Sequence, residues 1–80
     1  MSGRIMVEFL GMVKGPGGAR KLEVGADGII TVAALLVGAL GFTREHAEIL
    51  VVLRDGARLR MKDELSPGER LEISLHIGGG

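Results

Sequence analysis

Three consecutive glycines, Gly78, Gly79 and Gly80, are the residues whose type and spacing best support chemistry. Glycine has no Cβ, so an extended glycine run can pass through a channel that excludes every other residue. Three extended residues span about 10 Å at roughly 3.3–3.6 Å each. A free carboxylate at Gly80 is unhindered, and an enzyme can join it to the α-phosphate of ATP before a persulfide, thiol or amine attacks the acyl carbon. We therefore expect an activated C-terminus formed by these glycines, in a protein that is a substrate and not a catalyst.

Chance does not readily explain this run of glycines. Glycine occupies 14 of the 80 positions, and chains of such composition end in three glycines in roughly 0.5% of cases. The alternative interpretation is a frayed or engineered end, because chain termini are commonly disordered. We expect residues 1–77 to form one domain and residues 78–80 to form a flexible tail.

The remaining composition argues against chemistry within the chain itself. Cysteine is absent, which excludes disulfides, thiolate zinc sites and thiol nucleophiles. His46 and His76 are the only imidazoles, and we expect both to be surface residues. The pairs of acidic residues lie in no predicted cleft, and a cleft is what would tune a carboxyl group for acid–base catalysis. We expect no bound cofactor, no metal and no enzymatic activity, with ATP used only by an activating partner.

A glycine-rich loop, Gly15-Pro16-Gly17-Gly18, is a weaker candidate for phosphate binding. It leads into a predicted strand and lacks the G-x-x-x-x-G-K-[ST] spacing that places phosphate at a helix N-terminus. We interpret it as a turn.

Charge and hydropathy restrict the partners and the location. Ten basic and ten acidic residues cancel, so the basic surface that nucleic acid or an anionic membrane requires is missing. The apolar stretch at residues 29–42 is shorter than the ~20 residues that span a bilayer. We expect a cytoplasmic protein that recognises its partners by shape and by apolar patches.

The first half of the chain has the pattern of two strands and a helix. Apolar and polar residues alternate over residues 4–10 and again over 19–24, which indicates half-buried strands joined as a hairpin. Thr31 has the position of a helix N-cap, apolar residues follow at helical spacing, and Gly41 supplies the C-terminal stop. A short helical turn is expected over residues 43–48.

The second half has the pattern of three strands. Asp55-Gly56 predicts a tight hairpin between strands over residues 49–54 and 57–61, because both turn positions need positive φ. Ser66-Pro67-Gly68 predicts a second turn, and residues 69–77 alternate as a last strand. The expected fold class is α+β, in the order β-β-α-β-β-β, with one mixed sheet packed on one main helix.

Surplus apolar residues predict a surface that binds a partner. The positions taken to face the helix are Ile5, Val7, Val51, Leu53 and Leu59. The opposite face then carries apolar residues close to the tail, and adaptable Met and aliphatic side chains suit docking. The predicted docking surface comprises Met6, Leu50, Val52, Met61 and His76. The alternatives are an inverted facing of strand 49–54 or burial under a loop.

The predicted helix is also apolar on its outer side. Ala33, Ala34 and Val37 lie opposite Leu35 and Leu36, so a second contact or self-association should cover this side.

Several of these features together resemble the sulfur-carrier family, which includes the small subunit of molybdopterin synthase, the thiamine sulfur carrier and the ubiquitin-related and archaeal modifiers. The specific features are the run D-E-L-S-P-G-E-R-L-E-I at residues 63–73 and the glycine end, and the resemblance extends from Ile5 to Gly80. It implies a ubiquitin-like β-grasp fold and adenylation of the last glycine by a ubiquitin-activating-type enzyme, followed by conversion to a thiocarboxylate.

The resemblance also implies the partners. The sulfur acceptor would be molybdopterin synthase large subunit, thiazole synthase or tRNA thiolation machinery. Two alternatives remain open: a protein modifier joined to target lysines through Gly80, and a ubiquitin-like interaction domain that never reacts.

Overall fold

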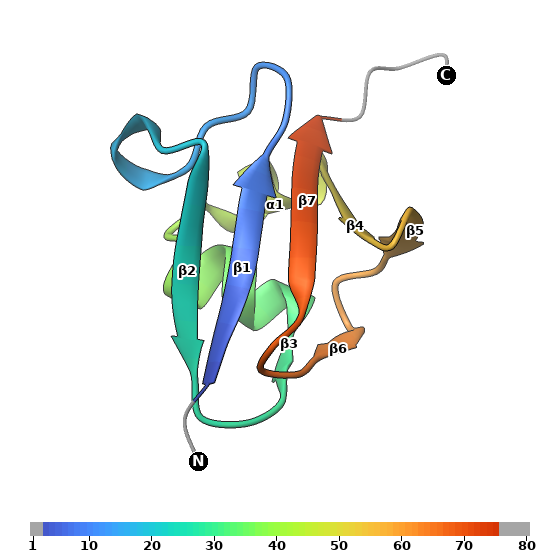
Figure 1. The fold of residues 1–80 in the computed structure, drawn as a ribbon. Coiled ribbons are helices and arrows are strands. Elements are labelled where there is room, and N and C mark those ends of the chain that lie inside the picture. The colour runs from blue at the N-terminus through green and yellow to red at the C-terminus, as the bar shows by residue number, and fades with distance from the viewer. Residues whose placement is uncertain (1–2, 76–80) are drawn as a thin grey trace.

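The computed structural model describes residues 3–75 as a five-stranded mixed sheet with helical segments packed on one face (Figure 1). The order of strands across the sheet is β2-β1-β7-β4-β5. The strands are β1 (Gly3–Phe9), β2 (Lys21–Ala26), β4 (Leu50–Arg54), β5 (Ala57–Leu59) and β7 (Arg70–Leu75). The expected α+β class with one mixed sheet is therefore confirmed, and the expectations for His76 and for Gly78 to Gly80 lie outside the described residues.

The two central strands follow the alternation in the sequence. β1 buries Ile5, Val7 and Phe9, and β7 buries Leu71 and Ile73, all at 0–1% exposure. β1 pairs antiparallel with β2 and parallel with β7, where Val7 lies opposite Leu71. The side chains on the outer face of β1 and β7 meet water, so apolar and polar residues alternate along both strands. This alternation predicts which side of each strand faces the core.

The hairpin from β4 to β5 forms as expected, with φ values of 54° at Asp55 and 81° at Gly56. The predicted facing of β4, however, is wrong. Leu50 and Val52 are only 6% and 2% exposed, so they belong to the core and not to a docking surface. The reason is register: Leu50 lies opposite Leu75 and Val52 opposite Ile73, and paired residues share a face of the sheet.

The main helix begins and ends where the sequence predicts, but it is wider than an α-helix. The Oγ1 atom of Thr31 accepts a hydrogen bond from the Ala34 amide at 3.1 Å. Segment η2 (Ala34–Ala39) is a π-helix, and the Leu40 amide donates to the Leu35 carbonyl at 2.9 Å. This five-residue step brings Leu35 and Leu40 to the same side, where both are buried. Gly41, at φ 80°, closes the helix.

A short second helix, α1 (Arg44–Glu48), follows as expected. Its N-cap is Thr43, whose Oγ1 atom accepts from the His46 amide at 3.1 Å. α1 packs against η2 and leads directly into β4. The ring of His46 meets Phe42 edge-on, with centroids 5.1 Å apart.

Three short elements are missing from the sequence-based prediction. They are the 3-10 turn η1 (Pro16–Gly18) and the strands β3 (Ile30–Thr31) and β6 (Glu64–Leu65), which form a separate two-stranded sheet. Two-residue strands have no periodicity to detect. The β3–β6 pair nevertheless helps to close the core, because Leu65, opposite Ile30, is fully buried.

Candidate functional site

The strand that leads toward the glycines is held firmly in the sheet. β7 pairs with β1 on one side and with β4 on the other. It therefore has no free edge, and its last described residue, Leu75, lies opposite Leu50. Figure 1 shows that β7 ends at the same end of the sheet as the loop that follows β1. Leu75 is therefore held in place by the sheet.

An apolar hollow lies at this end of β7. We call it the β7-end hollow; it measures about 350 Å³ and is lined by Leu10, Gly11, Met12, Ser74 and Leu75. Met12 is 88% exposed and Leu75 is 37% exposed. None of the lining residues is charged. Exposed methionine and leucine beside a concave surface are typical of a docking site, because unbranched thioether side chains adapt to a partner.

Backbone hydrogen bonds hold the loop of the β7-end hollow against the strand. The Leu10 amide donates to the Ile73 carbonyl at 2.8 Å, and the Val13 amide donates to the Leu10 carbonyl at 3.2 Å. Gly11 adopts the left-handed conformation at φ 62°. Further along the loop, a Cβ on Gly15 would lie 2.4 Å from the Phe9 ring, so only glycine lets this ring and the backbone approach so closely.

The predicted docking residues are not brought together by the structure. Leu50 and Val52 are in the core. Met61 is partly buried and packs against the core. Met6 is the one member that remains partly exposed on the outer face, and His76 lies outside the described residues. Met12 has no periodic signal in the sequence, because it lies in a glycine-rich loop. Its proximity to Leu75 follows from the parallel pairing of β1 with β7.

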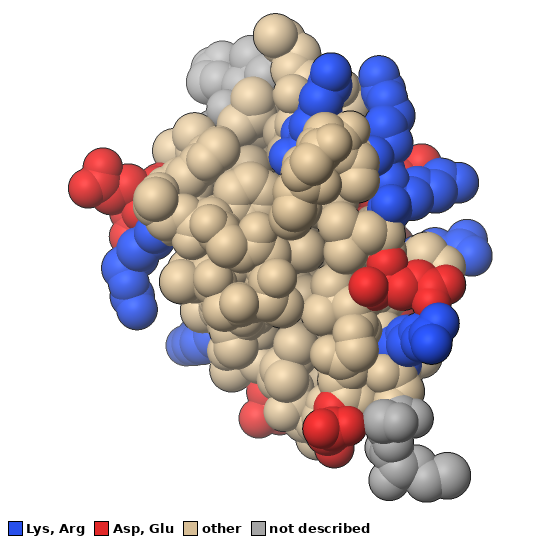
Figure 2. Space-filling view, turned by 90° about the vertical axis from the view of Figure 1, so that its left-hand side faces the viewer, with Lys and Arg blue, Asp and Glu red and all other residues tan. Residues whose placement is uncertain are grey.

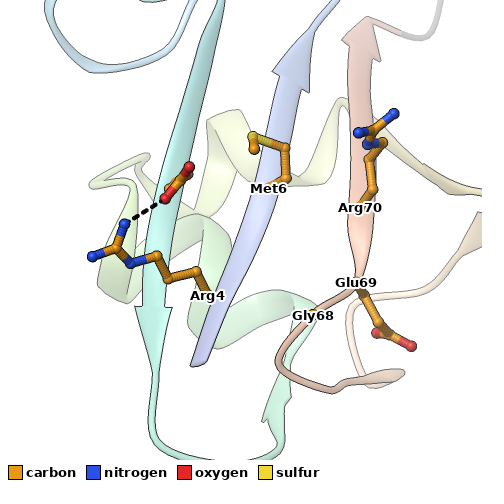
Figure 3. A pocket seen from close by; sticks show the side chains of 6 residues that line it. Arg4, Met6, Gly68, Glu69 and Arg70 are labelled. Carbon is orange, nitrogen blue, oxygen red and sulfur yellow. Dashed lines mark hydrogen bonds and ion pairs between the residues drawn. The ribbon is translucent and has the colours of Figure 1, made fainter. Parts of the chain in front are cut away.

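A second hollow lies at the opposite end of β7 and is charged. We call it the β7-start hollow; it measures about 370 Å³ and is lined by Arg4, Met6, Glu23, Gly68, Glu69 and Arg70. Arg4 and Glu23 form an ion pair, with 2.8 Å between Nη1 and Oε2. In Figure 3 the side chains of Arg4, Glu69 and Arg70 point away from one another. Arg4 is neutralised by Glu23, and Glu69 and Arg70 point away from this pair and from each other, so the β7-start hollow gives no binding site for an ion of either sign.

The acidic run before β7 has a structural role. Arg54 Nη1 donates to Glu69 Oε1 and to the Glu64 carbonyl, both at 3.1 Å. Glu69 Oε1 also accepts from the Ser66 amide at 2.8 Å. Gly68, at φ 96°, occupies the turn position that needs positive φ. This network, defined by Arg54, Glu64, Ser66 and Glu69, fixes the turn from which β7 begins.

A metal-binding group and a membrane-crossing helix are both missing from the part of the chain that the structure describes. Among residues 3–75, no three His, Asp or Glu side chains are grouped so that they could hold a metal ion. Over the same residues, no helix combines the length and the hydropathy that a membrane crossing requires.

The geometry defines a class, a small α+β protein with a mixed five-stranded sheet and an apolar hollow at the end of its central strand. Comparison with family models, with curated proteins and with solved structures finds no match to this chain. The sulfur-carrier family therefore stays a prediction from the residues named above.

Proposed function

We propose that this protein is a ubiquitin-like sulfur carrier with a β-grasp fold. In this proposal a ubiquitin-activating-type enzyme adenylates the Gly80 carboxylate with ATP, and the adenylate is converted to a thiocarboxylate. One observation carries the proposal: β7, paired on both sides, leads from the middle of the sheet toward the glycine run, beside an exposed apolar hollow. A rigid strand followed by side-chain-free residues suits delivery of a carboxylate into a narrow active site.

The proposed chemistry has two substitution steps. A carboxylate oxygen of Gly80 attacks the α-phosphorus of ATP, and pyrophosphate leaves. Hydrosulfide then attacks the acyl carbon and AMP leaves, which gives the thiocarboxylate. Where the sulfur source is an enzyme persulfide, a second thiol cleaves the resulting S–S bond and forms a disulfide with the donor sulfur. The carrier contributes only the carboxylate, which fits a chain with no cysteine.

The β7-end hollow is the proposed docking surface for the activating enzyme. Met12 and Leu75 expose apolar area next to the origin of the tail. Burying such area on binding contributes about 25 cal/mol per Å² before the cost of association is subtracted. Docking at this position would place the glycines of the tail at the partner's active site.

The test is the intact mass of the full chain. The mass of protein isolated from its own cells first establishes whether Gly80 is the last residue. The chain is then incubated with ATP, sulfide and the adenylating enzyme from the same genome. We expect the mass to increase by the difference between sulfur and oxygen. A ladder of lysine conjugates would instead favour the protein modifier.

The matched control is a variant that keeps the Gly80 carboxylate but obstructs its passage into the narrow active site of the enzyme. Gly79→Val adds a branched side chain to the tail, and we expect loading to be lost while the melting temperature stays the same. The enzyme must first be shown to be active, by ATP–pyrophosphate exchange with another carrier. If the mass of the wild-type chain does not change with such an enzyme, the proposal is refuted.

A further inference from the structure

β2 is an edge strand with an unused row of backbone groups. It is the outermost strand of the sheet and, within residues 3–75, pairs only with β1. The Phe9 amide donates to the Arg20 carbonyl at 2.8 Å, which fixes the alternation: Leu22 and Val24 direct their backbone groups toward β1. The amides and carbonyls of Lys21 and Glu23 therefore point away from the sheet and can accept another strand.

On the helix side of this edge, the surface is largely uncharged. Figure 2 looks onto the β2 side of the molecule and shows a broad uncharged area, with acidic and basic side chains at its margins. Residues 29–42 contain no charged side chain. Ile29 is 64% exposed, Val37 on η2 is 38% exposed, and the small residues Ala34, Gly38 and Ala39 are exposed as well. An uncharged helix side of this kind favours association.

We propose that a second copy of this chain covers this surface, with β2 of each copy paired antiparallel across a two-fold axis at Leu22. In this register Lys21 lies opposite Glu23 of the second copy, and the symmetry repeats the pair. Both residues are exposed on the outer face of the sheet, so each pair joins opposite charges. Lys21 and Glu23 are also the residues with outward backbone groups, and the same register forms their hydrogen bonds.

Charge selects this register over its neighbours. Moving the axis by one residue along β2 toward its C-terminal end places Glu23 opposite Glu23 of the other copy. Moving the axis by one residue toward the N-terminal end places Lys21 opposite Lys21. Like charges directly opposite each other destabilise a strand pair, whereas opposite charges stabilise it. The spacing Lys21-x-Glu23 is therefore complementary to itself, which is the arrangement that a two-fold interface requires.

The same axis brings the uncharged helix surfaces together. Both copies of η2 lie on one side of the continuous sheet, because the two-fold axis is perpendicular to it. Leu22, partly buried in one copy, then meets Leu22 of the other. β1 separates β2 from β7 in each copy, so the pairing of the two β2 edges involves no residue of β7. The dimer and the carrier function are independent proposals.

The experiment measures the mass of the full chain in solution by sedimentation equilibrium. We expect the wild-type chain to dimerise. Lys21→Glu and Glu23→Lys each place like charges opposite one another, and each alone should weaken dimerisation about tenfold or more. An equimolar mixture of the two variants should dimerise, because one copy is then acidic at both positions and the other is basic at both.

A control separates this effect from the loss of the intramolecular ion pair. Arg4→Ala removes the partner of Glu23 but leaves the charges on the β2 edge, so its dimerisation should match wild type. Circular dichroism checks that each variant is folded. A wild-type chain that stays monomeric at about 1 mM, or a mixture that associates no better than either variant, would overturn the proposal.

Discussion

The two ends of the parallel pair β1 and β7 differ in how far the side chains around them find partners within the chain. Both strands begin at one end of the sheet and finish at the other (Figure 1). The β7-start hollow and the β7-end hollow have similar volumes, about 370 and 350 Å³. The first is lined by charges, one pair of which bonds within the chain; the second is lined by uncharged residues, with Met12 almost fully exposed.

This difference indicates which end is available to a partner. At the start of β7, the network of Arg54, Glu64, Ser66 and Glu69 uses its polar groups to close the fold. At the end of β7, apolar area is left in contact with water, which is unfavourable for the isolated chain. Exposed apolar area that no other part of the described chain covers is more informative than exposed charge, because charge is normal at a surface.

The largest effect should come from the inner face of β7, which supports both ends. Ile73 is fully buried between Phe9 on β1 and Val52 on β4. Ile73→Ala removes most of its side chain from a packed core, and we expect a loss of about 2–5 kcal/mol in the free energy of unfolding. Urea denaturation measures it. Leu75→Ala, two residues on and 37% exposed, is the control and should cost less; equal losses would mean that the two positions are equally packed.

The same strands show what the sequence could and could not predict. The facing of β1 and β7 was predicted because their outer side chains are polar and reveal the period of two. Residues 49–54 are almost continuously apolar, so the sequence leaves the facing of β4 undetermined, and its register with β7 decides it. Of the predicted docking residues, Leu50 and Val52 rest on that facing, and both are buried in the core. Met12 was missed because its neighbour Leu75 is distant in sequence.

A smaller effect should distinguish the polar contacts at the start of β7. Arg54 and Glu69 are 34% and 29% exposed, whereas Arg4 and Glu23 are 75% and 44% exposed. Water screens the second pair more strongly, so the coupling energy should be about 1 kcal/mol for Arg54–Glu69 and about 0.5 kcal/mol or less for Arg4–Glu23. Double-mutant cycles with Arg54→Met and Glu69→Gln, and with Arg4→Met and Glu23→Gln, measure both.

The order of these two coupling energies is the informative result. A larger coupling energy for Arg4–Glu23 than for Arg54–Glu69 would contradict the view that the polar groups of the turn before β7 are the more tightly bonded. If both couplings were near zero, the turn would be held by its backbone alone, through Pro67 and the positive φ of Gly68.

The smallest effect on stability, and the most informative one for function, should come from Met12. Its side chain is 88% exposed, so Met12→Ser should change the free energy of unfolding by about 0.5 kcal/mol or less. Under the proposed function it should raise KM for the carrier in the adenylation reaction, because the hollow loses apolar area that the enzyme would bury. We expect kcat to change little, since Gly80 and its chemistry are intact. Adenylation kinetics by pyrophosphate exchange measure both constants.

Met6→Ser is the matched control, because it makes the same substitution in the β7-start hollow. If the apolar end is the docking surface, KM should rise for the Met12 variant and stay at the wild-type value for the Met6 variant. The reverse result would move the docking surface to the outer face of the sheet, where Met6 lies between Glu23 on β2 and Arg70 on β7. In that case the charges around Met6 would select the partner, and raising the salt concentration should weaken its binding.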